Sequence, residues 1–255
     1  GSASSAASSS AASSSAASSE AASSSAAAEL TTVESGKLTM ATNATFPPYE
    51  MTTDAGTIEG IDIDTAQAIA DKLGLELQVD NMEFDSSLLS VQQGKADIVM
   101  AGVTVTPERQ NVMDFSDSYA TGIQSVIVTN DSEIATLEDL SGHLIGTQRG
   151  TTGYLYCTDD FGEDSVIAYD SGLTAVQALN NGQVDCVVID DAPAQAYVAA
   201  NPGLKVLDTS YAVEEYAIGI AKGNTALLDA VNAALAELAE EGTLQAIVDK
   251  YITAE

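Results

Sequence analysis

Arginine is scarce in this 255-residue chain, whose 8 Lys+Arg face 38 Asp+Glu, yet one arginine stands where a helix is expected to begin. Thr106 and Pro107 are residue types found at an N-cap and a first helical position, which places Arg109 in the first turn. A cation there is unfavourable by roughly 0.3–1 kcal/mol, so we expect a negative group against it. A guanidinium can bind a carboxylate through two parallel hydrogen bonds. The alternative is an ordinary ion pair with a nearby acid such as Glu108 or Asp114.

A second group of hydrogen-bond donors is expected in "RGTTGYLY", which begins at Arg149. Gly150 allows a tight turn there, and Thr151 or Thr152 is expected to cap a helix whose first N–H groups point outward. Such N–H groups bind anions. The alternative is that the turn is only a helix cap. It is not a phosphate-binding loop, because no Gly-Lys-Ser/Thr follows it.

Two adjacent acids supply the opposite charge. Asp190 and Asp191 end the apolar run "VDCVVI", so one is expected to cap the next helix and the other to accept hydrogen bonds from an ammonium group. Phe46 and Phe84, two of four phenylalanines, lie in predicted loops and are either core residues or the two walls around a ligand. A carboxylate clamp, an ammonium acceptor and two aromatic walls are the set of groups that recognises an α-amino acid zwitterion.

The elements that would position these residues form two β-α-β units of similar size. This order is typical of parallel sheets with crossover helices, in which ligands bind beyond the carboxyl ends of the strands. The loops "ATNATFPPYE", "AGVTVTPER", "QRGTTG" and "DDAP" follow such strands, so we expect them to face one cleft. Strands are expected at 37–42, 75–79, 96–102, 144–148, 165–170 and 184–190; helices at 62–73, 85–94, 106–110, 150–157, 171–183 and 191–201, with two C-terminal helices broken at Gly242.

Composition excludes several classes of function. The net charge of −30 argues against nucleic-acid and anionic-lipid partners, because binding phosphate needs clustered Lys/Arg. No apolar run reaches the roughly 18 residues of a membrane helix. Residues 1–30 are almost entirely Ser and Ala and are expected to form a flexible tether. Cys157 and Cys186 lack metal-binding spacing and His143 cannot complete a zinc set with them, so no metal or cofactor is expected. The two cysteines are either bridged or free, and we favour free thiols.

The order and spacing of several blocks resemble one known family over residues 37–252. The chain is similar to the extracellular solute-binding proteins of polar-amino-acid ABC transporters, family 3. The blocks that carry this resemblance are "ATNATFPPYE", "IEGIDIDTAQAIADKLG", "NMEFDSSLLSVQQGKADIVMAGVTVTPERQNVMDFSDSYA", "IGTQRGTTG", "GQVDCVVIDDAPA" and "EEYAIGIAKGN".

The resemblance implies an α/β fold with two Rossmann-like lobes and a two-strand hinge, the type II periplasmic-binding-protein fold. Lobe 1 would comprise residues 31–120 and 217–255, and lobe 2 residues 121–216. The hinge crossings would lie near 119–124 and 213–217. The C-terminal helices would return to the first lobe.

The resemblance also implies a role for each candidate site residue. Arg109 and Thr104 would hold the ligand carboxylate, with further donors from residues 151–152. Asp190 would hold the α-ammonium, and Asp191 would be the helix cap. The full set, including two residues that supply backbone groups and two aromatic walls, is Asn43, Phe46, Phe84, Ala101, Gly102, Thr104, Arg109, Gln148, Thr151, Thr152 and Asp190.

One departure from the family bears on the ligand. Many relatives that bind basic amino acids have an Asp after the first strand, where this chain has Asn43. Gln148 would face the ligand side chain as a neutral polar group, and Arg149 would point out of the pocket by strand alternation. We therefore predict a neutral polar ligand such as glutamine, with a basic or an acidic amino acid as the alternative.

The implied function is to bind a free L-amino acid and deliver it to an ABC transporter permease, without catalysis. The protein would be an extracellular or periplasmic monomer, and its Ser/Ala tether would suit a lipoprotein with a lipidated cysteine before residue 1. The main rival is an enzyme similar to arogenate/prephenate (cyclohexadienyl) dehydratases, with Glu50 and Asp85 as possible acids; His143 is expected away from the cleft. A second rival is a sensor that resembles receptor ligand-binding lobes.

Overall fold

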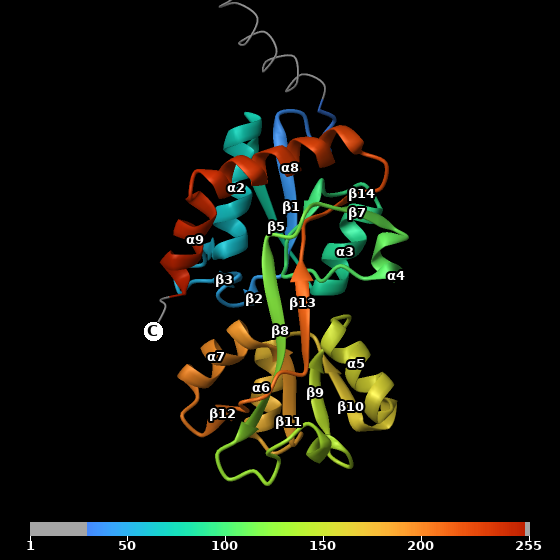
Figure 1. Cartoon of the computed structure of the whole chain (residues 1–255), viewed down its shortest axis with the longest axis vertical. Coiled ribbons are helices and arrows are strands. Elements are labelled where there is room, and N and C mark those ends of the chain that lie inside the picture. The colour runs from blue at the N-terminus through green and yellow to red at the C-terminus, as the bar shows by residue number, and fades with distance from the viewer. Residues whose placement is uncertain (1–29, 253–255) are drawn as a thin grey trace, which may run out of the picture. The chain divides into compact units, whose positions relative to one another are not determined.

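Two β-sheets organise the compact unit Thr31–Glu255 of the computed structural model, which describes residues 30–252 (Figure 1). The tether expected at 1–30 therefore lies, apart from Leu30, outside the described residues. In the first sheet the strand order is β5-β1-β6-β14-β7. Strand β1 runs parallel to β5 and β6, and β14 is antiparallel to β6 and β7. These strands are β1 Lys37–Thr42, β5 Glu76–Asn81, β6 Ile98–Val99, β7 Met113–Phe115 and β14 Gly219–Ala221.

The second sheet has the strand order β10-β9-β11-β8-β12, and β13 pairs with β8 beside this path. Its strands β10, β9 and β11 are parallel, and β8 is antiparallel to β11, β12 and β13. Its strands are β8 Ala120–Thr129, β9 Ile145–Gln148, β10 Val166–Tyr169, β11 Cys186–Asp190, β12 Leu204–Val206 and β13 Ala212–Tyr216. A small third sheet contains β2 Thr45–Phe46, β3 Glu50–Thr52 and β4 Ile58–Glu59.

The antiparallel pair β8 and β13 runs between the two groups of elements (Figure 1). The chain leaves the first group through β8 and returns through β13, so the two strands must run in opposite directions. This explains why both sheets are mixed, whereas the sequence pattern predicted parallel sheets. The parallel part of each prediction is confirmed for β1, β5 and β6 and for β9, β10 and β11. The lobe boundaries at residues 120 and 216 stay a prediction.

Helices cover the sheets where the sequence predicted them. In α2 the buried residues Ala66, Ile69 and Ala70 recur at helical spacing, and Gly74 ends the helix with φ at 69°, a left-handed conformation that suits glycine. The helices are α2 Ile61–Leu73, α3 Phe84–Gln92, α4 Pro107–Gln110, α5 Thr152–Phe161, α6 Gly172–Asn180, α7 Asp191–Ala200, α8 Thr225–Glu240 and α9 Thr243–Tyr251, with short 3₁₀ turns at Glu138–Leu140 and Glu163–Ser165.

The C-terminal helices pack on the first group of elements. Both α8 and α9 contact α2, and Leu227, Val231 and Leu235 of α8 join the core around β1. Gly242 separates the two helices with φ at 81°, as the predicted break requires. Cys157 and Cys186 are buried and free in the core of the second sheet, in agreement with the favoured alternative.

Candidate functional site

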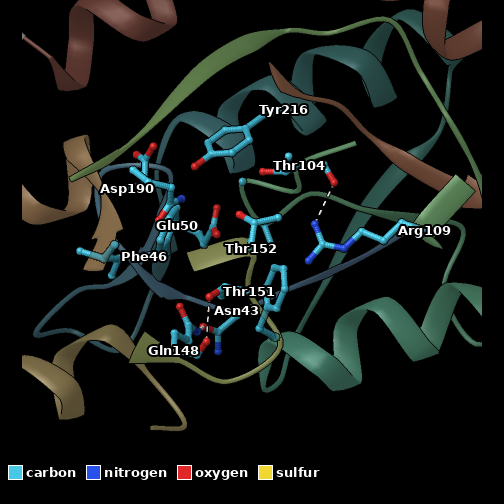
Figure 2. A pocket seen from close by; sticks show the side chains of 15 residues that line it. Asn43, Phe46, Glu50, Thr104, Arg109, Gln148, Thr151, Thr152, Asp190 and Tyr216 are labelled. Atoms are coloured by element: carbon cyan, nitrogen blue, oxygen red, sulfur yellow. Dashed lines mark hydrogen bonds between the residues drawn. The ribbon is translucent and has the colours of Figure 1, made fainter. Parts of the chain in front are cut away.

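One pocket contains every residue that the sequence analysis assigned to ligand binding (Figure 2). The space outside the atoms around its lining side chains is about 410 Å³, including open solvent. Eleven of the lining residues are those predicted: Asn43, Phe46, Phe84, Ala101, Gly102, Thr104, Arg109, Gln148, Thr151, Thr152 and Asp190. Four other residues line the pocket: Glu50, which was expected only as a possible acid of the rival enzyme, and Gln124, Ile189 and Tyr216, which were not expected there.

The pocket lies where four strands end, as expected. Asn43 follows β1 and residues 101–104 follow β6, whereas Thr151 follows β9 and Asp190 ends β11. The carboxyl ends of these strands in the two sheets therefore supply one set of polar groups. The crossing strands add Gln124 and Tyr216 to it.

Arg109 is buried at 9% exposure and spans the pocket edge. Thr106 caps α4 by accepting the Arg109 N–H, and Pro107 is the first helical residue, which confirms the predicted local structure. The guanidinium donates to the carbonyl of Thr104 at 2.8 Å and to that of Gly150 at 3.1 Å. Burial lowers the pKa of Arg109, and the nearby charges of Glu214 and Asp85 act against this shift. Arg109 makes no ion pair within the described residues, so the alternative of a surface pair is wrong.

The Thr104 hydroxyl is committed to a partner on β13. It donates to Glu214 at 2.7 Å, and the Gln124 amide donates to the same carboxylate oxygen at 3.2 Å. Because a hydroxyl has one proton, Thr104 Oγ1 does not donate into the pocket in this arrangement. Donors near Arg109 come instead from the start of α5, where Thr151 is the N-cap and accepts the Tyr154 N–H. The first N–H groups of a helix have no partner within it.

Asp190 has two roles in the structure. It is buried at 2% exposure, and its Oδ1 accepts the Ile123 N–H at 2.9 Å. Its Oδ2 accepts the Ala192 N–H at 3.3 Å and so caps α7. Asp191, which the sequence analysis took for the cap, instead accepts the Ser125 hydroxyl. That assignment is wrong because α7 begins one residue earlier than the cap prediction required. Burial raises the pKa of Asp190 to about 7, against the hydrogen bonds that it accepts.

Two amides face each other across the bottom of the view in Figure 2. Gln148 Nε2 donates to Asn43 Oδ1 at 3.0 Å, and Asn43 Nδ2 donates to the Met82 carbonyl at 2.7 Å. Asn43 Oδ1 also accepts the Thr45 hydroxyl, so both acceptor positions of this oxygen are used. Gln148 keeps one N–H and its Oε1 without a partner among the described residues.

The two phenylalanines lie on regular elements rather than in loops. Phe84 is the first residue of α3, with its ring centroid 5.4 Å from the Arg109 guanidinium carbon. Phe46 belongs to β2 and packs against Tyr49 with centroids 5.8 Å apart. Both predictions of a loop position are therefore wrong, because the short helix and strand begin earlier than their polar neighbours indicated. Both rings still line the pocket.

The remaining candidates lie elsewhere. Arg149 is half exposed and paired with Asp170, so its predicted direction out of the pocket is confirmed. His143 lies beside Asp185 at 3.2 Å in a different hollow. Of the four other lining residues, Glu50 lies seven residues after Asn43 in the same sequence block, and Gln124 and Tyr216 lie in the predicted crossing strands. The segments that contain these residues could be recognised in the sequence. The sequence does not show, however, which side chains of a crossing strand point into a pocket.

Comparison with known proteins identifies the family. The profile described as "Bacterial extracellular solute-binding proteins, family 3" matches residues 38–254. The chain belongs to this family. The L-cystine-binding protein TcyJ of Escherichia coli (strain K12) is 32% identical over 225 residues, which cover 87% of this chain and 85% of that protein. The ABC transporter arginine-binding protein 1 of the same strain is 34% identical over 220 residues, covering 84% and 90%.

A solved structure supports the fold. An ancestral arginine-binding protein bound to glutamine matches with a TM-score of 0.83 at 39% sequence identity, covering 87% of this chain and all of that one. The fold is therefore the type II periplasmic-binding-protein fold that the resemblance implied. Members of this extracellular family are solute-binding proteins for transport, which is a different class from the dehydratase rival. Among residues 30–252, no helix is both long enough and apolar enough to span a bilayer.

Proposed function

We propose that this solute-binding protein holds a free L-amino acid in the pocket of Figure 2 and delivers it to the permease of an ABC transporter. The observation that carries the proposal is that Arg109 and Asp190 line one pocket from opposite sides (Figure 2). A guanidinium on one side of the pocket and a carboxylate on the other can pair with the two charged ends of a zwitterion. Each ligand charge then has a partner, which offsets the cost of removing it from water.

The carboxylate end is assigned to Arg109 and the start of α5. Two of the five guanidinium N–H groups are used by the Thr104 and Gly150 carbonyls, which fixes the plane of the group and leaves other N–H groups for a ligand. Because Gly150 belongs to the loop after β9, this contact also brings the first turn of α5 toward Arg109. The unpartnered N–H groups of that turn and their helix dipole favour a negative group.

The side-chain end is assigned to Gln148. Its remaining N–H and carbonyl oxygen offer one donor and one acceptor, which is the pattern that a primary amide complements. A glutamine side chain would satisfy both groups, and the rings of Phe46 and Phe84 would contact its methylene carbons. Glutamine is accordingly the first candidate ligand.

The binding groups come from both groups of elements, so ligand binding is expected to close the pocket. Arg109 belongs to the first group of elements, whereas Thr152 and Asp190 belong to the second. A ligand that bridges them stabilises the closed arrangement, because only there does it interact with both groups at once. The permease would then recognise the closed form. Lipid anchoring before residue 1 and a monomeric state stay predictions.

A thermal-shift screen against the twenty amino acids tests the proposal. A ligand that binds only the folded protein stabilises it by about 2.7 kcal/mol at a hundredfold excess over Kd. Glutamine is expected to give the largest rise in melting temperature, with calorimetry to follow. If none of the twenty shifts the transition, the proposed function is wrong.

A basic amino acid is the second candidate, favoured by a specific imbalance of charge. The buried acids Asp190, which lines the pocket, and Glu214, which is bonded to the pocket residue Thr104, stand against the buried cation Arg109. A cationic side chain would reduce this imbalance, and several relatives are named as arginine-binding proteins. Competition between arginine and glutamine, measured by calorimetry, decides between the two candidate ligands. The second candidate is selected if arginine binds at least about tenfold more tightly, a difference of about 1.4 kcal/mol in binding free energy.

A further inference from the structure

Glu50 is the least satisfied polar group of the pocket. It lies at the start of β3 with 0% exposure, and neither carboxyl oxygen has a conventional donor among the described residues. The carboxyl of Asp62, also at 0% exposure, belongs to the neighbouring segment, and the Asp62 N–H donates to the carbonyl of Tyr49, the residue before Glu50, at 2.8 Å. Ionised carboxylates only accept hydrogen bonds, so two buried carboxyls at this place are compatible only if one of them carries a proton.

The surroundings decide which carboxyl carries the proton. Asp62 accepts the Gly102 N–H at 3.1 Å and the Tyr119 hydroxyl at 2.8 Å. Donors stabilise an ionised acceptor, and Glu50 has none of them. The proton therefore resides on Glu50. Burial, followed by the charge of Asp62, raises the pKa of Glu50 well above its ordinary value.

Among the described residues, no cationic side chain neutralises the two carboxyls in place of this proton. Among residues 30–252, neither carboxyl is hydrogen-bonded or ion-paired to a Lys, Arg or His side chain, and Arg109 is bonded to two carbonyls at the other side of the pocket. The groups that face the pair from its own segment and from the neighbouring elements are all acids or phenols: Tyr49, Tyr119, Asp190 and Tyr197.

The pair connects the pocket to the crossing strands. Asp62 holds the N–H of Gly102, which lines the pocket with φ at 58° and leaves only 2.8 Å between a Cβ at that position and the Phe46 ring. Asp62 also holds the hydroxyl of Tyr119, the residue before β8, whose N–H donates to the Tyr216 carbonyl on β13. A change at the pair is thus transmitted to a binding loop and to both crossing strands.

We propose that Glu50 and Asp62 share one proton at neutral pH, and that this acid pair positions the Gly102 loop and the start of β8 for ligand binding. The inference rests on the proposed function, because it concerns the same pocket. When pH rises, the proton leaves to solvent and two buried carboxylates remain side by side. Their repulsion in a poorly solvated site disturbs both contacts of Asp62.

The test compares wild type with Glu50→Gln, whose amide keeps a donor to Asp62 but cannot ionise. Stability conferred by a protonated pair is present at low pH and is lost as pH rises through the pKa of the folded pair. Thermal unfolding without ligand should therefore show a fall in the wild-type midpoint as pH rises above the ordinary carboxyl pKa of about 4.3, and this fall should be absent, or much smaller, in the variant. Infrared difference spectra at neutral pH should show a protonated carboxyl band that Glu50→Gln removes.

Binding is measured by calorimetry with glutamine over the same range. Wild-type affinity should fall by up to about tenfold per pH unit above the pKa of the pair, whereas the affinity of Glu50→Gln should change much less over the same range. Deprotonation of the ligand ammonium affects both proteins equally and cancels in the comparison. Glu59→Gln, at an exposed site, is the matched control and should follow wild type.

Two results would overturn the inference. Parallel pH curves for wild type and Glu50→Gln would mean that no proton is shared. A protonated carboxyl band that is unchanged in Glu50→Gln would mean that the proton lies elsewhere. If wild type binds no amino acid, the proposed function fails, but ligand-free unfolding and infrared spectra still test the shared proton.

Discussion

Arg109 is both a candidate ligand for a carboxylate and a structural contact between the loops that follow β6 and β9. Its guanidinium lies over the Phe84 ring and donates to carbonyls of Thr104 and Gly150. A buried arginine with these partners is expected to affect both binding and stability. The second arginine, Arg149, is exposed and paired at the surface, and it provides the comparison.

Arg109→Ala should abolish amino-acid binding and also lower the free energy of unfolding. The buried carbonyl of Thr104 and the partly buried carbonyl of Gly150 lose their donor, and an unsatisfied buried group costs about 1–3 kcal/mol. Calorimetry measures the first effect and urea unfolding the second. Arg149→Ala should change neither by much, since surface ion pairs contribute about 0–1 kcal/mol. Equal affinities for wild type and Arg109→Ala would reject the assigned clamp.

Asp190 should make binding depend on pH below neutrality. The ligand ammonium pairs with the ionised carboxylate, whereas the pKa of Asp190 in the free protein is raised to about 7. Affinity should therefore fall as pH decreases from 7 towards 5, by up to about tenfold per unit. The effect on stability has the opposite sense, because a raised pKa favours folding at low pH and that contribution is lost as pH rises through 7. Asp190→Asn should bind weakly at every pH, and a retained pH slope in that variant would assign the titration elsewhere.

Gln148 should determine the preference among side chains. Replacing its amide by a carboxylate in Gln148→Glu removes a donor and adds a negative charge to the same place. The affinity ratio of arginine to glutamine should rise by roughly tenfold or more, since charged hydrogen bonds contribute about 1.5–3 kcal/mol. Competition calorimetry gives this ratio directly. An unchanged ratio would show that Gln148 does not contact the ligand side chain.

At the scale of secondary structure, short elements with well-defined ends place the binding groups. Helix α5 begins at Thr152 because Thr151 accepts the Tyr154 N–H, and Thr151 also donates to the Gln148 carbonyl at 2.7 Å. One capping residue thus holds together the end of β9 and the start of α5. Helix α6 has a comparable cap, Ser171, away from the pocket.

Thr151→Ala and Ser171→Ala form a matched pair of cap deletions. Each should cost about 1 kcal/mol of stability, the usual value for a lost N-cap. Only Thr151→Ala should also weaken amino-acid binding, because the first turn of α5 borders the pocket. Urea unfolding and calorimetry on both variants separate the two effects. Similar losses of affinity in the pair would show that the α5 terminus has no special role.

At the scale of the whole unit, the pocket exists because β8 and β13 bring two sheets to one site. Glu214 on β13 accepts hydrogen bonds from Thr104 and from Gln124 of β8, so the crossing strands are tied to the binding loop after β6. Ligand contacts on both sides should favour the closed form over more open ones.

Closure should be visible in solution as a decrease in the radius of gyration on addition of the ligand. Small-angle scattering of wild type with and without saturating glutamine measures it. Arg109→Ala, which lacks the clamp, should show no ligand-dependent change. A wild-type radius that stays constant at saturation would mean that binding does not require movement of the two sheets.

The sequence by itself determined the helices, the parallel strands of both sheets and most of the groups that line the pocket. It could do so because helical spacing of apolar residues, Gly74 and Gly242 at helix ends, and loops at strand ends are local features. The tertiary structure decided which of Asp190 and Asp191 caps α7, that Phe46 and Phe84 belong to a strand and a helix, and that Glu50 lies beside Asp62. These three features depend on burial and on residues that are distant in the sequence. The protonation of a carboxyl and the position of an aromatic ring are determined by the groups that pack against them.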